Sequence, residues 1–549
     1  MSRLHIIWFG FLLGGVVVGT RLFSIQIVDH SVYLAMAQGQ QEFYEDLIPS
    51  RGEIFTRDGY PLALNRNWFN VYAVPRDVKD KKVVAREVAS ILSLDEGEVF
   101  SRLDKKDDPY EPLKSKVTDK EVAKLKKFDF PGIRFLSETG RYYPEGGLAA
   151  HLLGFVDMEG EGRYGLEGRF NEDLKGDNGF LSGDRDAHGN WVGDGSFEPA
   201  KDGGDIVLTI DHLIQFKAEE ELKRLVEFYN PSGGSILVLE PDSGRIRAMA
   251  SYPFFDPNNY QSVDSISSFL NPVVNSQFEP GSVLKVLTMA AAIDDGKITP
   301  ETTYFDNGSR FIDEYEIKNF DEKSYGEMTM SEVIQKSLNL GAIFASEQME
   351  KKDYLGYLKK FGLGERSGVD LSGELGGDIS NLDYEVNVNY ATAAFGQGIS
   401  MTPLQLGMAV GVIANGGALM EPLIFEGDRV REVDRVISPE TALSVASMMQ
   451  GAIEGYSGAS VPGFSLAGKT GTAQIAEAGG YADYKWTHSF VGFGPIGDAK
   501  FVVLLKLDQP QGVRYATTSL SSSFKNLATF LLGFYKIAPS FQIEEEVLD

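Results

Sequence analysis

The chain opens with an apolar run. Residues 4–20 are apolar apart from His5, lie between Arg3 and Arg21, and are followed by further apolar positions up to Val28. Seventeen residues is the short end for a membrane-spanning helix. A cleaved signal peptide and an uncleaved anchor both fit this run. The apolar continuation favours the anchor, with Arg21 reaching the membrane surface. Because only three residues precede the run, we expect a single-pass protein of the cytoplasmic membrane with nearly the whole chain on the extracytoplasmic side.

Residues 29–230 show a mixed α/β pattern with many turns. Asp58-Gly59 predicts a hairpin turn, and the charge-dense residues 105–128 predict a solvated helical lobe. The Gly- and Asp-rich stretch 183–204 predicts a long exposed hairpin or loop. Residues 205–211 then read as a strand, followed by a helix with a one-sided apolar stripe.

The pattern changes after Asn230-Pro231, where a second domain is expected to begin. Strands are predicted at 235–240, 245–250, 464–473, 488–494 and 500–507, and helices at 282–294, 330–349, 353–361, 403–414, 439–454 and 518–536. This order predicts an α+β fold, in which an antiparallel five-stranded sheet is flanked by helices. The expected organisation is a cytoplasmic stub and transmembrane anchor at 1–28, a mixed α/β domain at 29–230, a C-terminal α+β domain at 231–540 and an acidic tail at 541–549.

Composition narrows the possible functions. The chain has 549 residues and a formal net charge of −27, so nucleic acid is not an expected partner. The absence of cysteine excludes disulfides, thiolate metal sites and cysteine nucleophiles. The six histidines lack ligand-like spacing, so we expect no metal site and no cofactor.

The strongest candidate chemistry lies in Glu279-Pro280-Gly281-Ser282-Val283-Leu284-Lys285. A helix starting here places Ser282 and Lys285 three residues apart on one face. A serine hydroxyl becomes a nucleophile when a neighbouring base takes its proton, and a buried lysine with a lowered pKa can be that base. The pattern Ser-x-x-Lys is short, however, and Ser522 with Lys525 also matches it.

Two later segments complete the pattern. Ser337-Leu338-Asn339 lies near the end of a predicted helix, and Lys469-Thr470-Gly471-Thr472 lies in a predicted strand. Gly471 allows another backbone or a ligand to approach that strand closely. An alternative interpretation of Lys469 is a protective charge on an exposed edge strand. Ser-x-x-Lys, Ser-x-Asn and Lys-Thr-Gly in this order define the active site of penicillin-binding proteins and serine β-lactamases.

The chain resembles the class B penicillin-binding proteins, monofunctional peptidoglycan D,D-transpeptidases, along nearly its full length. The resemblance includes an elongated N-terminal pedestal domain of the dimerisation type, and the pairing of the lysine motif with Ser489 to Phe493 favours the division-type, FtsI-like branch. Thr56 and Asp58 depart from the pedestal motif and put the branch and its partner contacts in doubt. Besides the three motifs, the resemblance rests on Arg51 to Ala63, Arg141, Tyr143-Pro144, His151, Gly165 to Glu167, Phe395 to Gly398 and Thr402 to Leu406.

The resemblance implies roles for the site residues. Ser282 is implied as the nucleophile and Lys285 as its base, with Ser337 relaying the proton, Lys469 tuning it and Asn339 binding the substrate. Thr470, Gly471 and Thr472 are implied as substrate-binding, and the backbone amides of Ser282 and Thr472 as the oxyanion hole.

The implied partners are stem peptides ending in D-Ala-D-Ala, β-lactam antibiotics as covalent inhibitors, a membrane-embedded glycan polymerase and other division proteins. The alternatives are a β-lactamase or β-lactam sensor, a D,D-carboxypeptidase, an elongation-type transpeptidase and a non-catalytic scaffold.

Overall fold

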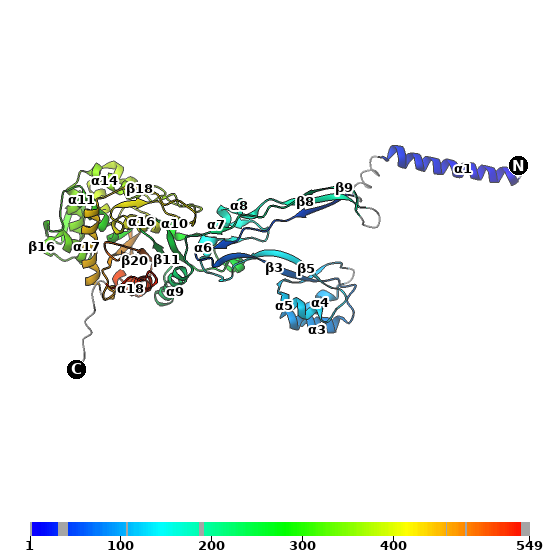
Figure 1. Ribbon diagram of the computed structural model, residues 1–549, viewed down its shortest axis with the longest axis horizontal. Helices are drawn as coiled ribbons and strands as arrows, with labels where there is room; N and C mark the ends of the chain where they lie inside the picture. The colour runs from blue at the N-terminus through cyan, green and yellow to red at the C-terminus, as the bar shows by residue number, and fades with distance from the viewer. Residues whose placement is uncertain are drawn as a thin grey trace. The chain divides into compact units, whose positions relative to one another are not determined.

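The computed structural model describes residues 3–30, 42–105, 108–185, 191–456, 458–477 and 480–539, which form two compact units (Figure 1). One unit comprises residues 1–52 and 172–204, and the other comprises residues 53–171 and 205–549. The predicted acidic tail at 541–549 lies outside the described residues.

The first unit contains the N-terminal helix and a small sheet. Helix α1 (Arg3–Phe23) continues as a π-helical turn over Ser24–Val28, so the predicted continuation past Arg21 is confirmed. In the described part of the chain, one helical span, Ile7–Val28, is long and apolar enough to cross a membrane. Strands β1 (Glu42–Leu47), β8 (Gly179–Arg185) and β9 (Trp191–Glu198) form an antiparallel sheet in that order. The β8–β9 pair is the predicted hairpin, and its tip at 186–190 lies outside the described residues.

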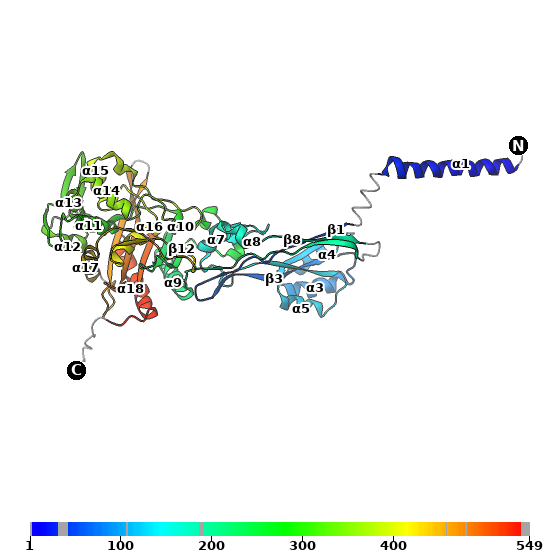
Figure 2. The ribbon, with the colours of Figure 1, turned by 45° about the horizontal axis from the view of Figure 1, so that its top comes forward.

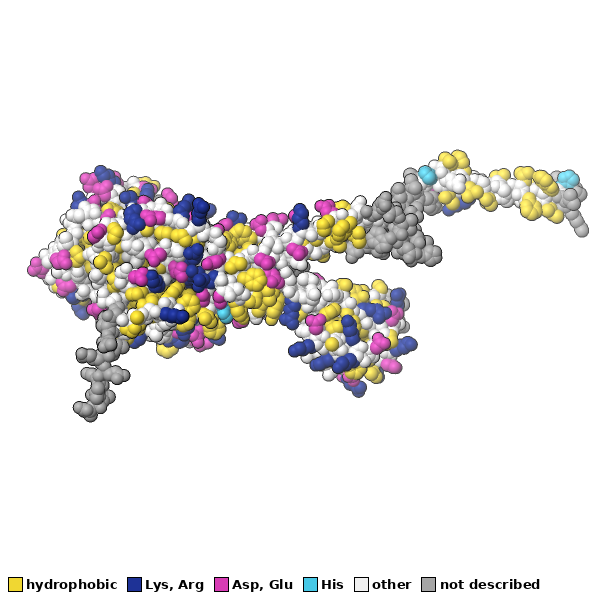
Figure 3. Space-filling model, viewed as in Figure 1, with side chains coloured by type: hydrophobic (Ala, Val, Ile, Leu, Met, Phe, Trp, Pro, Cys, Tyr) yellow, Lys and Arg dark blue, Asp and Glu magenta, His cyan; other side chains and the backbone are white. Residues whose placement is uncertain are grey.

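The second unit begins with a five-stranded sheet and a helical lobe. Strand β3 (Pro61–Ala73) pairs with β2 (Ile54–Phe55), β4 (Glu111–Val117) and β5 (Ile133–Tyr142), and β10 (Ile206–Val207) lies parallel to β2. The positive φ of Gly59 (+80°) allows the turn between β2 and β3, as predicted. Helices α3 (Lys81–Leu92), α4 (Glu96–Leu103) and α5 (Asp119–Lys126) complete the lobe, whose surface mixes basic and acidic side chains (Figure 3).

Two sequence predictions in this region were wrong. Residues 111–117 are a strand rather than helix, because Leu113 and Val117 alternate inward and join the core of the lobe. The strand predicted at 205–211 has only two residues, because Asp211 is the N-cap of helix α9 (His212–Tyr229). Its carboxylate accepts the backbone N–H groups of Leu213 and Ile214.

The pedestal motif residues meet around a buried ion pair. Arg141 Nε lies 2.6 Å from Glu167 Oε1, and the two side chains are 3% and 0% exposed. The Tyr143 hydroxyl also donates to Glu167, at 3.2 Å. Motif segments that lie 26 residues apart in the chain are therefore joined by a charge-assisted contact.

The central sheet of the second unit has five antiparallel strands, as predicted. Its order is β12-β11-β21-β20-β19, so the first two strands meet the last three through β11 and β21. The bounds are β11 (Gly233–Leu239), β12 (Ile246–Tyr252), β19 (Ala467–Glu477), β20 (Gly480–Gly494) and β21 (Phe501–Asp508).

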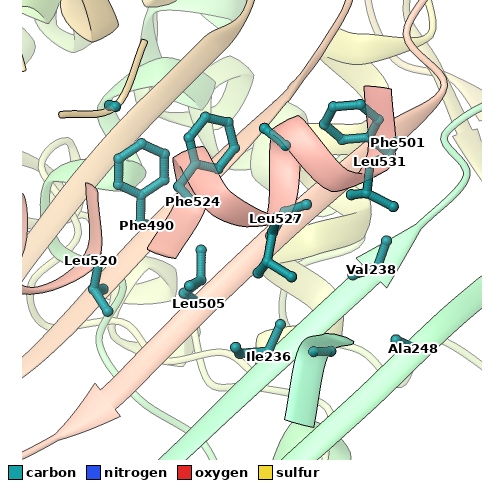
Figure 4. Packing of buried hydrophobic residues seen from close by; sticks show 14 of the residues in the cluster. Ile236, Val238, Ala248, Phe490, Phe501, Leu505, Leu520, Phe524, Leu527 and Leu531 are labelled. Carbon is teal, nitrogen blue, oxygen red and sulfur yellow. The ribbon is translucent and has the colours of Figure 1, made fainter. Parts of the chain in front are cut away.

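Helices cover both faces of this sheet. Ile236 and Val238 share a hydrophobic cluster with residues of α9 and α18 (Ala516–Phe534). Figure 4 shows the two strand residues on the same side of the sheet as Leu527 and Leu531 of α18, and Figure 2 shows α9 and α18 beside the sheet. The alternate residues Leu237 and Leu239 face Gly407 on α16 (Pro403–Ala414). Because the strand is covered on both sides, all but its first residue are buried.

The predicted helix 330–349 is broken. Helix α12 (Met330–Lys336) ends at Ser337, which has a left-handed φ of +60°, and α13 (Asn339–Glu347) starts after it. The other helices of this region are α10 (Pro272–Asn275), α11 (Lys285–Asp294), α14 (Lys351–Lys360), α15 (Asn387–Ala393) and α17 (Pro439–Gly455). Two-stranded antiparallel sheets pair β13 (Thr303–Asp306) with β16 (Gly326–Thr329), β14 (Ser309–Ile312) with β15 (Tyr315–Lys318) and β17 (Ala418–Met420) with β18 (Glu432–Arg435).

Candidate active site

Ser282 lies in a tight turn rather than in the first turn of an α-helix. Residues Gly281–Val283 form a 3₁₀ turn ahead of α11. The N–H of Gly281 donates to the carbonyl of Gly396 at 3.0 Å, and a Cβ at Gly396 would lie 2.1 Å from the Gly281 oxygen. The segment Phe395 to Gly398 therefore packs its backbone directly against the Ser282 turn, and only a glycine at position 396 leaves room for this contact. The half-buried Ser282 hydroxyl has no hydrogen-bond partner among the described residues.

Lys285 is the first residue of α11 and is 0% exposed. Its Nζ donates to the Ser337 carbonyl at 2.6 Å and lies 3.3 Å from Ser337 Oγ. Burial, and then the charge of Lys469, hold the pKa of Lys285 well below its ordinary value of 10.5. A lowered pKa favours the neutral amine, which is the form that can act as a base. In this structure the amine contacts the Ser-x-Asn segment, and among the described residues it forms no hydrogen bond with Ser282.

Ser337 is positioned by the break between α12 and α13. A capping box of Thr329 and Glu332 fixes the start of α12, and the left-handed φ of Ser337 ends that helix. The Ser337 hydroxyl is the meeting point of two lysines, because it lies 3.3 Å from Lys285 Nζ and 3.0 Å from Lys469 Nζ. Lys285 lies 52 positions before Ser337 and Lys469 lies 132 positions after it, yet both contact the same hydroxyl oxygen.

Asn339 is held by residues that the sequence did not single out. Its backbone N–H donates to Asn319 Oδ1 at 3.0 Å, and its Nδ2 donates to the Lys318 carbonyl at 2.8 Å. Asn319, itself buried, donates to both oxygens of the fully buried Asp306 at 2.9 and 3.0 Å. Asn319 lies 20 positions before Asn339 and Asp306 lies 33 positions before it. Neither residue belongs to a recognisable motif, so no sequence signal pointed to their role.

Lys469 lies on β19, an edge strand of the central sheet, but its side chain is buried, so its interpretation as a protective surface charge is wrong. It is 0% exposed, and its Nζ donates to Ser337 Oγ and to the Tyr456 hydroxyl at 3.0 Å each, and to the Thr470 carbonyl at 3.2 Å. Tyr456 follows α17 and was not predicted as a site residue.

Gly471 brings the β19 strand against the turn of Ser282. A Cβ at this position would lie 2.6 Å from the Pro280 carbonyl oxygen and 2.4 Å from Ser489 Oγ. The expectation that a backbone approaches closely here therefore holds, and the approaching backbone is the one that carries Ser282. The neighbouring Thr472 accepts the N–H of Ala516 with its hydroxyl at 3.0 Å, and Thr470 is buried.

The second Ser-x-x-Lys match lacks the contacts that surround Ser282 and Lys285. Ser522 and Lys525 lie within helix α18, with Ser522 exposed on its outer side. Neither contacts Ser337 or Lys469 among the described residues. Within the same part of the chain, no group of three or more His, Asp or Glu side chains could hold a metal ion.

The arrangement combines an alcohol in a rigid turn, a buried neutral amine, a second buried amine and an amide side chain at one place. A neutral base beside a hydroxyl can activate a nucleophile, and a buried cation can stabilise negative charge that develops nearby. Such a set of groups suits acyl transfer through a serine ester.

Comparison with known proteins supports this reading. The family model described as "Penicillin binding protein transpeptidase domain" matches residues 234–528, and "Penicillin-binding Protein dimerisation domain" matches residues 46–208. Stage V sporulation protein D of Bacillus subtilis is 33% identical over 515 residues, covering 90% of this chain and 80% of that protein. Peptidoglycan D,D-transpeptidase FtsI of Escherichia coli is 27% identical over 521 residues, covering 93% and 87%.

A solved structure agrees in fold. The crystal structure of penicillin binding protein 3 of Mycobacterium tuberculosis, complexed with aztreonam, has a TM-score of 0.68 and 26% identity, and covers 90% of this chain and 98% of that one. The family resemblance read from the sequence motifs is confirmed by these matches. This chain belongs to the class B penicillin-binding proteins and is a serine-type peptidoglycan D,D-transpeptidase.

Proposed function

We propose that this transpeptidase forms its acyl-enzyme on Ser282 and crosslinks stem peptides that end in D-Ala-D-Ala. The observation that carries the proposal is the meeting of two lysine amines on the Ser337 hydroxyl, at 3.3 and 3.0 Å, next to the turn that holds Ser282. The two amines are suited to different roles, because burial and the neighbouring charge lower the pKa of Lys285 and so favour its neutral form. Lys285 serves as the base, and Lys469 carries the positive charge.

In acylation, Ser282 Oγ attacks the carbonyl carbon of the penultimate D-Ala while Lys285 takes its proton. The backbone N–H groups of Ser282 and Thr472 hold the oxyanion, and one such donor is typically worth about 10²–10³ in rate. The peptide bond then breaks, leaving an ester on Ser282. The proton passes from Lys285 through the Ser337 hydroxyl to the amine of the departing D-Ala.

Substrate binding uses the edge of the central sheet. Strand β19 ends the strand order, so the backbone of residues 470–472 is suited to pair with an extended peptide. Asn339 binds the substrate's amide backbone, and Lys469, Thr470 and Thr472 receive its terminal carboxylate. The amine of a second stem peptide then attacks the ester, which forms the crosslink and restores Ser282. β-Lactams occupy the same place and acylate the same oxygen.

The cellular setting follows from the anchor and from the relatives. The apolar N-terminal helix is suited to hold the protein in the cytoplasmic membrane, with the catalytic domain on the extracytoplasmic side, where peptidoglycan lies. Relatives named FtsI and Stage V sporulation protein D favour a role in septal wall synthesis over an elongation role. A membrane-embedded glycan polymerase and other division proteins are the partners that this role requires.

A labelled penicillin tests the assignment. It should attach covalently to the wild-type protein and to Ser522→Ala, and fail to attach to Ser282→Ala. Lys285→Ala should abolish the labelling and Lys525→Ala should preserve it. Labelling that persists in Ser282→Ala would contradict the assignment of the nucleophile.

The products of the reaction distinguish a transpeptidase from a β-lactamase and from a D,D-carboxypeptidase. A β-lactamase would turn over a chromogenic cephalosporin many times, whereas a transpeptidase stops after one equivalent. A D,D-carboxypeptidase would release D-Ala without forming dimeric peptide. Release of D-Ala together with crosslinked dimer is the expected result.

A further inference from the structure

Lys469 is an ammonium group whose three N–H bonds each face an acceptor. The acceptors are Ser337 Oγ, the Tyr456 hydroxyl and the Thr470 carbonyl, at 3.0, 3.0 and 3.2 Å. Because Lys469 is 0% exposed, water does not replace a lost partner. We propose that Tyr456 is a positioning residue of this site, whose hydroxyl and ring face hold the Lys469 side chain directed at Ser337. The inference rests on the proposed function of Ser282.

Tyr456 is itself held firmly. It follows the last residue of α17, and its backbone N–H donates to the Ile453 carbonyl at 3.0 Å. Its ring packs edge-on against Phe490 of β20, with 6.4 Å between ring centroids and 74° between planes. The hydroxyl therefore projects toward Lys469 from the main hydrophobic cluster.

The electrostatic setting shows why this hydroxyl matters. Among the described residues, no carboxylate lies within 4 Å of either Lys285 or Lys469, so neither amine has an ion-pair partner. Burying an unpaired ammonium is costly unless polar groups replace water. Tyr456 supplies two such groups, its oxygen and the face of its ring, whose centroid lies 5.7 Å from Lys469 Nζ. Burial would raise the pKa of the Tyr456 phenol, but the Lys469 charge and hydrogen bonds from Lys469 and Thr470 lower it.

Tyr456 affects Lys285, the proposed base, by holding Lys469 in place. After burial, the charge of Lys469 is the second cause that lowers the pKa of Lys285. A Lys469 side chain that turned away from Ser337 would weaken both this effect and the proton relay. The titratable groups that face Lys469 among the described residues are Lys285 from α11 and Tyr456 after α17. In the described part of the chain, the Tyr456 hydroxyl forms a hydrogen bond with Lys469 and with neither Ser282 nor Lys285, so it acts on the reaction through Lys469.

The pH profile of acylation tests this role. In Tyr456→Phe the second-order rate constant for acylation by a fluorescent penicillin should fall about tenfold, as expected for one hydrogen bond to a charged group. The acid limb of the profile, below which Lys285 binds a proton, should move to higher pH. A Lys469 charge that no longer points at Ser337 lowers the pKa of Lys285 less.

Tyr390→Phe is the matched control. Tyr390 is also a buried tyrosine, and its hydroxyl donates to the Leu382 carbonyl at 2.7 Å rather than to either active-site lysine. The rate and the acid limb should stay at their wild-type values in this variant. A Tyr456→Phe protein with the wild-type rate and profile would overturn the inference. Slower acylation with an unmoved acid limb, or loss of the fold in thermal unfolding, would also overturn it by making the hydroxyl merely structural. If Ser282→Ala still labels, the proposed function itself fails, which is a separate result.

Discussion

Adding one carbon atom at Gly471 should displace the nucleophile. A Cβ at Gly471 would lie 2.6 Å from the Pro280 carbonyl oxygen, whereas ordinary contact begins at 3.4 Å. The turn that carries Ser282 must therefore move away from β19 by about 0.8 Å, since the obstacle is backbone rather than a flexible side chain. A misplacement of about 1 Å in an active site can lower the rate by about 10²-fold. We expect Gly471→Ala to slow acylation by about that factor.

The assay is the second-order rate constant for labelling by a fluorescent penicillin, with thermal unfolding measured on the same samples. Gly356→Ala on α14 is the matched control, because its Cβ would meet nothing within 4 Å, and it should acylate at the wild-type rate. The Cβ at Gly471 would also lie 2.4 Å from Ser489 Oγ. Adding Ser489→Ala should therefore not restore the rate, since the contact with Pro280 remains. A Gly471→Ala protein within about threefold of wild type would refute the claim that this backbone approach sets the geometry.

Three further predictions concern stability. Lys285→Met should compare more favourably with wild type in unfolding free energy at pH 7 than at pH 10. Between the lowered pKa of the folded state and 10.5, the unfolded chain binds the Lys285 proton and the folded chain does not, so the stability of the wild type rises with pH in that range. Urea unfolding at several pH values checks this. Burial lowers the pKa of His488 to about 4, so the unfolding free energy of the wild type should fall by about 3 kcal/mol between pH 6.5 and pH 4. In the same urea measurement, His488→Gln should lack this decrease. Asn319→Ala should cost about 2 kcal/mol in urea unfolding, because the buried Asp306 carboxylate and the Asn339 N–H lose a partner.

Several elements could be predicted because they depend on short-range pattern. Helices predicted at 403–414, 439–454 and 518–536 match α16, α17 and α18 within about two residues, and the Asp58-Gly59 turn followed from local backbone preference. The alternation of Leu113 and Val117 was masked by surrounding charges, so β4 was mistaken for helix. The helix predicted over 330–349 was broken because a left-handed residue at Ser337 leaves no mark in hydrophobic periodicity.

The sequence by itself determined which chemical groups this protein has available and in what order: Ser282 with Lys285, Ser337 with Asn339, and Lys469 with Gly471. These segments are motifs because the reaction needs those atoms at fixed local spacing. Only the tertiary structure decided that both lysines meet at one hydroxyl, and that Asn319 and Tyr456 hold the groups in place. Contacts of that kind join residues 13 to 132 positions apart, and they depend on how the sheet and its helices close on each other rather than on any local pattern.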